Sequence, residues 1–116
     1  MPGIIFLKTK QLEKIAEFYK QRLRMQIWID QGSCIILKKD NIILGFCEGE
    51  DISFSGIITF FHKSKEEVDA IYQKNTDIAL DKPHKNDKFN IYQFFAEDPE
   101  GRKLEFQKFL DTEIDY

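Results

Sequence analysis

The stretch 94–110, FFAEDPEGRKLEFQKFL, organises the rest of the chain. Two runs with strand-like apolar content, 92–96 and 103–109, lie on either side of the turn sequence DPEG. Pro99 presets the backbone dihedral of the first turn position, and Gly101 can adopt the positive φ that closes such a loop. The sequence therefore predicts a β-hairpin here.

A carboxylate lies in the middle of the second strand of this hairpin. Leu104 and Phe106 stand on either side of Glu105 in the sequence. Because successive side chains of a strand point to opposite faces, Glu105 points away from the face that the two apolar residues share. Glu105 is therefore a candidate functional residue.

Composition and charge restrict the class of protein. The chain has 116 residues, of which 42% are apolar, and a formal net charge of −3 with both signs intermixed. This pattern argues against a nucleic-acid or anionic-membrane surface. The first residues lack a signal-peptide pattern, and no run reaches the roughly 18 apolar residues of a membrane span. We expect a cytoplasmic protein, with a solvated acidic tail at 111–116.

Both cysteines lie in apolar, strand-like runs. Cys34 and Cys47 have neither CxxC spacing nor a neighbouring histidine. This pattern is typical of reduced core cysteines, with a reactive thiol as the alternative.

The first half of the chain reads β-α-β-β-β. It begins with an apolar strand-like run at 3–7. Between 12 and 23, apolar residues recur every three or four positions, which predicts an amphipathic helix capped near Thr9. Three more strand-like runs follow, at 25–30, 33–38 and 42–48.

The second half repeats this order. An apolar run at 56–61 precedes Ser64-Lys65-Glu66-Glu67, a capping box that predicts the start of a second helix. A weak strand at 78–80 and a polar loop through Pro83 and His84 then lead to the closing hairpin.

The two halves also match in spacing. Gly3-Ile4-Ile5 precedes Tyr19 by the same interval as Gly56-Ile57-Ile58 precedes Tyr72, a displacement of 53 residues. We therefore predict an α+β fold with two βαβββ repeats, at about 3–48 and 55–110, within a single domain spanning 1–116. Two curved mixed sheets with helices on their outer faces would form a cup.

Two segments resemble the vicinal-oxygen-chelate superfamily, which includes glyoxalase I, bleomycin-resistance proteins and extradiol dioxygenases. Phe95 to Phe106 is similar to the family's closing DP-x-G-x-x-(I/L)-E hairpin, and Leu12 to Tyr19 is similar to its first helix, which commonly ends in FY. The paired βαβββ pattern agrees with the resemblance, which covers nearly the whole chain.

The resemblance implies where a metal site would lie. In metal-dependent members, ligands come from the first, fifth and eighth strands. The eighth-strand position falls on Glu105, the first-strand position on Ile4, and the fifth-strand position on Gly56, or on Ile57 if the count slips by one. Isoleucine and glycine side chains cannot ligate a metal, and one carboxylate is not a site, because such centres need two to four converging protein ligands.

Glu105 and the two histidines keep alternative interpretations. Glu105 could accept hydrogen bonds from a polar or cationic ligand, act as a general base, or pair with a nearby Lys or Arg. The resemblance also allows a metal-dependent lyase, isomerase or dioxygenase in which Glu105 joins His62 or His84 around a divalent ion. As isolated histidines, both are more typical of surface positions.

Aromatic residues predict the wall of a ligand site. If strand parity holds, a set of side chains with Glu105 lines one inner surface that suits a planar or apolar ligand. The predicted ligand-binding residues are Trp28, Phe46, Phe60, Tyr92, Phe94 and Glu105. Packing in a core is the alternative for each aromatic residue. We expect a metal-free small-molecule-binding protein without a cofactor; the resemblance implies a homodimer.

Overall fold

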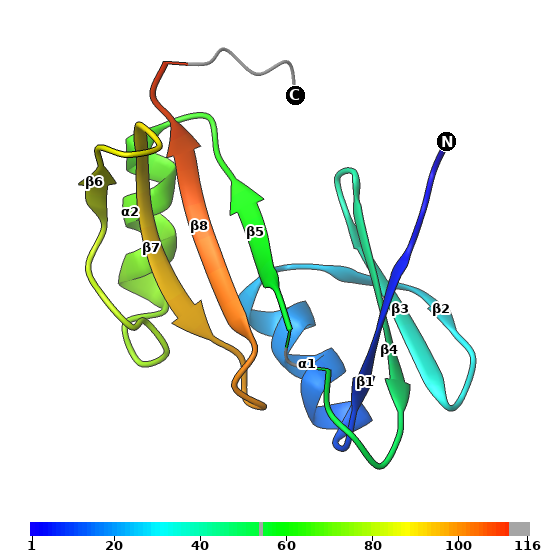
Figure 1. The fold of residues 1–116 in the computed structure, drawn as a ribbon. Coiled ribbons are helices and arrows are strands. Elements are labelled where there is room, and N and C mark those ends of the chain that lie inside the picture. The colour runs from blue at the N-terminus through cyan, green and yellow to red at the C-terminus, as the bar shows by residue number, and fades with distance from the viewer. Residues whose placement is uncertain (54, 112–116) are drawn as a thin grey trace. The chain divides into compact units, whose positions relative to one another are not determined.

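The computed structural model describes residues 1–53 and 55–111, which form two compact units. Unit 1 spans Met1–Phe54 and unit 2 spans Ser55–Tyr116. From residue 112 on, the predicted acidic tail lies outside the described residues. Each unit has the order β-α-β-β-β, so the predicted α+β fold of two βαβββ units is confirmed (Figure 1).

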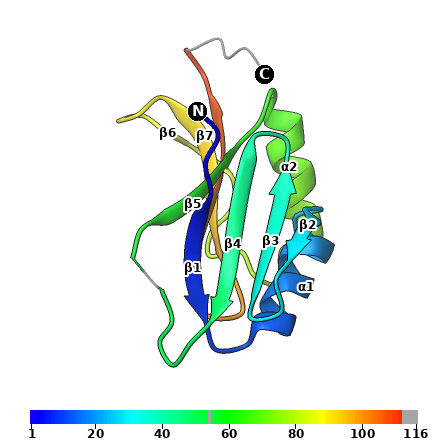
Figure 2. The ribbon, with the colours of Figure 1, turned by 90° about the vertical axis from the view of Figure 1, so that its right-hand side faces the viewer.

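Unit 1 forms a four-stranded mixed sheet with one helix on it. Its elements are β1 (Ile5–Thr9), α1 (Leu12–Arg22), β2 (Gln26–Asp30), β3 (Cys34–Lys39) and β4 (Ile42–Glu48). The strand order is β1-β4-β3-β2, with β1 parallel to β4 and the other pairs antiparallel. Figure 2 shows β4 between β1 and β3.

Unit 2 repeats this topology. Its elements are β5 (Ile57–Phe61), α2 (Lys65–Lys74), β6 (His84–Asn86), β7 (Ile91–Glu97) and β8 (Lys103–Phe109). The strand order is β5-β8-β7-β6, and β5 is parallel to β8. Within residues 1–53 and 55–111, no helix is long and apolar enough to cross a membrane.

One predicted strand of unit 2 was misplaced. The run 78–80 forms only a single bridge, from Ala79 to Ala96, whereas the second strand of unit 2 is β6, inside the predicted polar loop. Its sequence, His-Lys-Asn, has no apolar residue whose period could reveal a strand. Pairing with β7 therefore decides its conformation.

The predicted capping box begins α2. Ser64 Oγ accepts the backbone N–H of Glu67 at 3.1 Å. The Glu67 carboxylate accepts the N–H of Lys63, one residue before the cap, at 3.0 Å. One unpaired backbone donor of the first helical turn, that of Glu67, and the donor of the residue before the cap, Lys63, are satisfied in this way.

Packing against its helix defines two faces of each sheet. In unit 2, Phe94 contacts Tyr72 of α2 with ring centroids 5.4 Å apart, and Phe94 stacks on Phe106 at 5.0 Å. In unit 1, Phe46 contacts Tyr19 of α1 at 4.7 Å. We call the side of each sheet that carries these residues the helix-covered face and the opposite side the helix-free face.

The turn between β7 and β8 contains a buried network of charges. Asp98 Oδ1 accepts the N–H groups of Glu100 and Arg102, at 2.8 and 3.0 Å. Arg102 Nη1 donates to Asp98 Oδ2 at 3.0 Å and to Glu100 Oε1 at 2.9 Å. Gly101 has φ +85° and donates its N–H to the Asp98 carbonyl. The predicted hairpin is confirmed, and side-chain charges as well as turn propensity hold it.

Removing the cation of this network should strongly destabilise the protein. Arg102→Met keeps much of the apolar stem but leaves the buried carboxylates of Asp98 and Glu100 without their guanidinium partner. We expect the free energy of unfolding to fall by about 3–5 kcal/mol, measured by chemical denaturation. The exposed control Lys82→Met should stay within about 0.5 kcal/mol of wild type. Equal stabilities for the two variants would contradict this role of Arg102.

The two cysteines are joined by a disulfide, which corrects the expectation of reduced thiols. Cys34 and Cys47 lie directly opposite each other on β3 and β4, with Cα atoms 4.0 Å apart. The sequence positions alone did not reveal this register. Disulfides persist mainly in oxidising compartments, so the cytoplasmic placement stays a prediction.

The disulfide should stabilise the chain measurably. Its cysteines are 13 residues apart, and closing a loop of about 15 residues contributes about 3 kcal/mol in the chain-entropy account. Reductant should therefore lower the melting temperature of the wild type and leave that of a Cys34→Ser/Cys47→Ser variant unchanged. Two free thiols per unfolded, unreduced chain in a thiol assay would contradict the bond.

Candidate functional site

A row of polar side chains crosses the helix-free face of unit 2. Glu105 of β8 pairs with Thr59 of β5 on one side and with Phe95 of β7 on the other. Two residues along β8, Gln107 pairs with Gln93 of β7. Strand alternation places these side chains opposite the α2 contacts of Phe94 and Phe106. We call Thr59, Gln93, Glu105 and Gln107, with Asn86 of β6, the polar row.

Three members of the polar row, Gln93, Glu105 and Gln107, are buried, Thr59 and Asn86 are partly exposed, and the row is internally hydrogen-bonded. Thr59 Oγ1 donates to Glu105 Oε1 at 2.8 Å, and Gln107 Nε2 lies 3.4 Å from the same oxygen. Asn86 Nδ2 donates to Gln93 Oε1 at 2.9 Å. Gln93 is 2% exposed, Gln107 8% and Glu105 9%. These contacts fix the carboxylate of Glu105 among neutral partners.

Two acceptor atoms of the row lack a donor. Gln107 Oε1 is buried and has no hydrogen-bond partner among residues 1–53 and 55–111. Within the same residues, both hydrogen bonds that Glu105 accepts end on Oε1; Oε2 has no protein donor but, unlike Gln107 Oε1, is not fully buried. Buried polar atoms usually have a hydrogen-bond partner, so the unpaired Gln107 Oε1 needs an explanation.

Aromatic rings border the row on the same face. Phe95 lies opposite Glu105, and the Lys103 ammonium lies 4.3 Å from the Phe95 ring centroid. Phe61 pairs with Gln107 and lies 6.0 Å from Phe109. The face therefore combines a polar centre with apolar borders, a composition common in small-molecule sites.

The structure corrects the predicted aromatic wall. Phe60 stacks on Phe106 at 5.5 Å, so Phe60, like Phe94, lies on the helix-covered face. Tyr92 bonds to Asp69 of α2 and lies on that face too. Glu105 lies on the opposite face, so the expectation that these residues share one surface with it is wrong.

The reason is the strand parity of unit 2. The register pairs Glu105 with Phe95 and not with Phe94. A shift of one residue transfers every side chain of a strand to the other face. In unit 1, Phe46 likewise packs on α1 and is fully buried.

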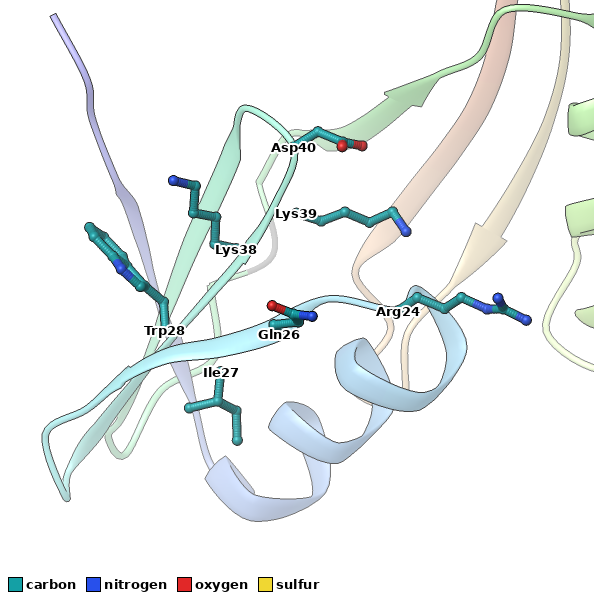
Figure 3. Close-up of a pocket in the computed structure, with 7 residues that line it drawn as sticks. All are labelled: Arg24, Gln26, Ile27, Trp28, Lys38, Lys39 and Asp40. Atoms are coloured by element: carbon teal, nitrogen blue, oxygen red, sulfur yellow. The ribbon is translucent and has the colours of Figure 1, made fainter.

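Trp28 is the predicted aromatic residue that stays accessible. It is half exposed, at a shift in register between β2 and β3, and Lys38 Nζ lies 5.4 Å from its ring centroid. Trp28 and Lys38 line a hollow of about 500 Å³ in unit 1 (Figure 3). It is lined by Arg24, Gln26, Ile27, Trp28, Lys38, Lys39 and Asp40. In Figure 3 Lys38 extends on the side of Trp28, whereas Arg24 and Lys39 extend away from it.

Tyr92 is held by a short hydrogen bond to α2. Its hydroxyl donates to Asp69 Oδ1 at 2.6 Å. This bond to the carboxylate, together with burial and the negative charges of Asp69 and Glu66, raises the pKa of Tyr92 to about 12. The protonated phenol is therefore favoured in the folded state.

This contact should shift the ionisation of Tyr92 to higher pH. Because its folded pKa lies above the unfolded value of 10.0, the stabilisation is complete below pH 10 and is lost as pH rises through about 12. We expect the difference in phenolate absorbance between wild type and Tyr92→Phe to rise near pH 12. A rise near pH 10 in the folded protein would show that the bond does not hold in solution.

The positions implied for a metal site hold no second ligand. Ile4 precedes β1, and Gly56, at φ +91°, precedes β5 in a conformation that favours glycine. Ile57 pairs with Lys103, whereas the β5 residue beside Glu105 is Thr59, which the sequence analysis did not identify. The Thr59 hydroxyl is already engaged as a donor to Glu105.

The two histidines do not complete a metal site with Glu105. His62 stacks toward Phe106, at 6.1 Å, on the helix-covered face. His84 lies on β6, separated from β8 by β7, and its Nδ1 lies 2.9 Å from the Lys82 carbonyl oxygen. Two strand spacings amount to about 10 Å. Among the described residues, no group of three His, Cys, Asp or Glu side chains is arranged to hold a metal.

Within residues 1–53, the pair related to Thr59 and Glu105 is apolar. The repeat displacement relates Thr59 to Phe6, which pairs with Gly45 of β4 as Thr59 pairs with Glu105. The Phe6 ring lies against Gly45, so closely that a Cβ at this position would overlap it. A glycine within a strand is typical of such an approach. The contact between Thr59 and Glu105 in unit 2 therefore has no counterpart at these two positions of unit 1.

Sequence reasoning identified one member of the row and missed the others. Because side chains two residues apart on a strand share a face, the position of Glu105 on β8 already predicts that Gln107 lies beside it. Predicting Thr59, Gln93 and Asn86 as members of the row would have required the pairing of all four strands of unit 2. Nothing local in the sequence gives that pairing.

Comparison with solved structures identifies the fold. A glyoxalase/bleomycin resistance protein/dioxygenase family enzyme from Burkholderia phytofirmans PsJN matches with a TM-score of 0.80 and 18% identity, over 92% of this chain and 97% of that one. A glyoxalase/bleomycin resistance protein/dioxygenase from Nocardioides matches with a TM-score of 0.79 and 17% identity, over 100% and 87%. Lactoylglutathione lyase from Agrobacterium tumefaciens matches with a TM-score of 0.76 and 17% identity, over 93% and 92%. No protein-family model and no curated protein matches the sequence.

The chain thus has the fold of the glyoxalase/bleomycin-resistance/dioxygenase proteins, over nearly its full length. The resemblance inferred from the closing hairpin and the first helix is confirmed at the level of the fold. Sequence identities of 17–18% support a shared fold and do not assign an activity.

Proposed function

We propose that this protein binds a small molecule without a metal ion, on the helix-free face of unit 2. It would be a binding protein of the glyoxalase/bleomycin-resistance type. The observation that carries the proposal is the polar row, in which the buried Gln107 Oε1 has no hydrogen-bond partner among the described residues. A bound ligand that donates a hydrogen bond would satisfy this atom.

The donor set supports a ligand other than a metal ion. Glu105 is surrounded by a hydroxyl and by amides, and Thr59 and Gln107 both direct donors at its Oε1. Transition-metal ions in proteins are generally held by several converging carboxylate, imidazole or thiolate ligands, and Ca²⁺ by six to eight oxygens that include carboxylates. The row offers one such group, with neutral side chains around it.

The borders of the row support a ligand with an apolar or planar part. Phe95 and Phe61 lie on either side of the polar centre, and Phe109 extends the apolar surface beyond Phe61. Apolar walls with a few fixed polar groups bind a ligand by burial and orient it by hydrogen bonds. These residues replace Phe60, Tyr92 and Phe94 as the proposed aromatic contacts.

A thermal-shift screen of aromatic compounds in EDTA tests this proposal. A specific ligand at one hundred times its Kd should stabilise the chain by about 2.7 kcal/mol, and EDTA should not reduce the effect. Thr59→Val, which removes the hydroxyl beside Glu105 at similar volume, should reduce the shift. The exposed Thr76→Val variant is the matched control and should behave as wild type.

Two results would overturn the proposal. The absence of a thermal shift with any compound of a broad screen would indicate that the face binds no small molecule. Stabilisation that disappears in EDTA and returns with a divalent ion, with about one ion bound per chain, would indicate the metal-dependent alternative.

A further inference from the structure

We propose that the ligand of the polar row is an organic cation that donates planar N–H groups, such as an amidinium or a guanidinium. This inference rests on the proposed function, because it assigns the chemical class of ligand for the same site. It follows from three properties of the row: its free hydrogen-bond acceptors, its uncompensated charge and its aromatic borders.

The acceptors without donors are both oxygens of β8. Gln107 Oε1 and Glu105 Oε2 belong to residues two apart on one strand, so their backbones are separated by about 7 Å on the same face. Thr59 donates to Glu105 and Asn86 donates to Gln93, so these two donors act within the row, whereas the side-chain amides of Gln93, Asn86 and Gln107 each keep an N–H group. A ligand that enters the row therefore meets the two β8 oxygens together with amide donors, and the charge of Glu105 decides which ligand the row prefers.

The charge of Glu105 has no cation beside it. Among residues 1–53 and 55–111, Glu105 takes part in no ion pair. Lys103, two residues earlier on the same strand face, lies instead over the Phe95 ring at 4.3 Å. Because Glu105 is 9% exposed, water screens its charge poorly, and a ligand cation would be attracted to it.

The aromatic borders also favour a cation. A cation over the face of a phenylalanine ring is attracted by the ring's quadrupole, and Lys103 already makes such a contact with Phe95. Phe61, beside Gln107, is 39% exposed, so its ring is accessible to a ligand. A planar N–H group that bonds to Gln107 and Glu105 would lie next to this ring.

Benzamidine, benzamide and benzoate form a matched series of probes. They share a phenyl ring and a planar head group but carry a positive, a neutral and a negative charge. By titration calorimetry or ligand-observed NMR, we expect benzamidine to bind at least ten times more tightly than benzamide, and benzoate not to bind. Glu105→Gln and Gln107→Leu should each weaken benzamidine at least tenfold.

The chain offers a control carboxylate on the same face. Glu97 of β7 is exposed and pairs with Lys103 on the helix-free face. Glu97→Gln changes the net charge by the same amount as Glu105→Gln, and it should leave benzamidine binding within twofold of wild type. Melting curves of all variants verify that each is folded.

The outcomes separate this inference from the proposed function. Equal binding of benzamide or benzoate, or a Glu105→Gln variant that binds benzamidine like wild type, would overturn the cationic class and leave small-molecule binding in place. Neutral hits in the broad screen without benzamidine binding would do the same. Failure of all three probes together with a silent screen would overturn both.

Discussion

The buried charge network in the turn between β7 and β8 is the constraint on which unit 2 depends. The Asp98 carboxylate accepts hydrogen bonds from the backbone of the turn. The Arg102 guanidinium donates to both the Asp98 and the Glu100 carboxylate. This arrangement fixes which residues of the two strands face each other. Because side chains alternate strictly along a strand, the same register assigns Phe94 and Phe106 to the core and Glu105 to the opposite face.

On the helix-free face of unit 2, Glu105 stands among neutral polar side chains. Glu105 occupies the eighth-strand position that the family resemblance assigns to a metal ligand. Its neighbour on β5 is Thr59, and the next polar residue on its own strand is Gln107. In unit 1 the related pair is Phe6 and Gly45, whose close contact leaves no room for a polar group. One carboxylate among amide and hydroxyl groups lacks the converging imidazole, thiolate or further carboxylate ligands that transition-metal sites generally use.

Much of the fold could be predicted because its signals are local. The three- and four-residue apolar period predicts α1, the serine and glutamate of the capping box predict the start of α2, and Pro99 with Gly101 predicts the last turn. β6 carries no such signal, since three polar residues become a strand only through pairing with β7. The bond between Cys34 and Cys47 likewise follows from the register of β3 and β4 and not from cysteine spacing.

The sequence by itself determined the repeat, the closing hairpin and the direction of Glu105 relative to Leu104 and Phe106. These features depend on residues close together in the chain, whose periodicity and turn chemistry are independent of the rest. Only the tertiary structure decided which face Phe60, Tyr92 and Phe94 occupy and which residues join Glu105. The physical reason is that neighbours on adjacent strands, such as Thr59 and Glu105, come from segments 46 residues apart. In addition, a register shift of one residue, even at the local turn between β7 and β8, exchanges the two faces of a sheet.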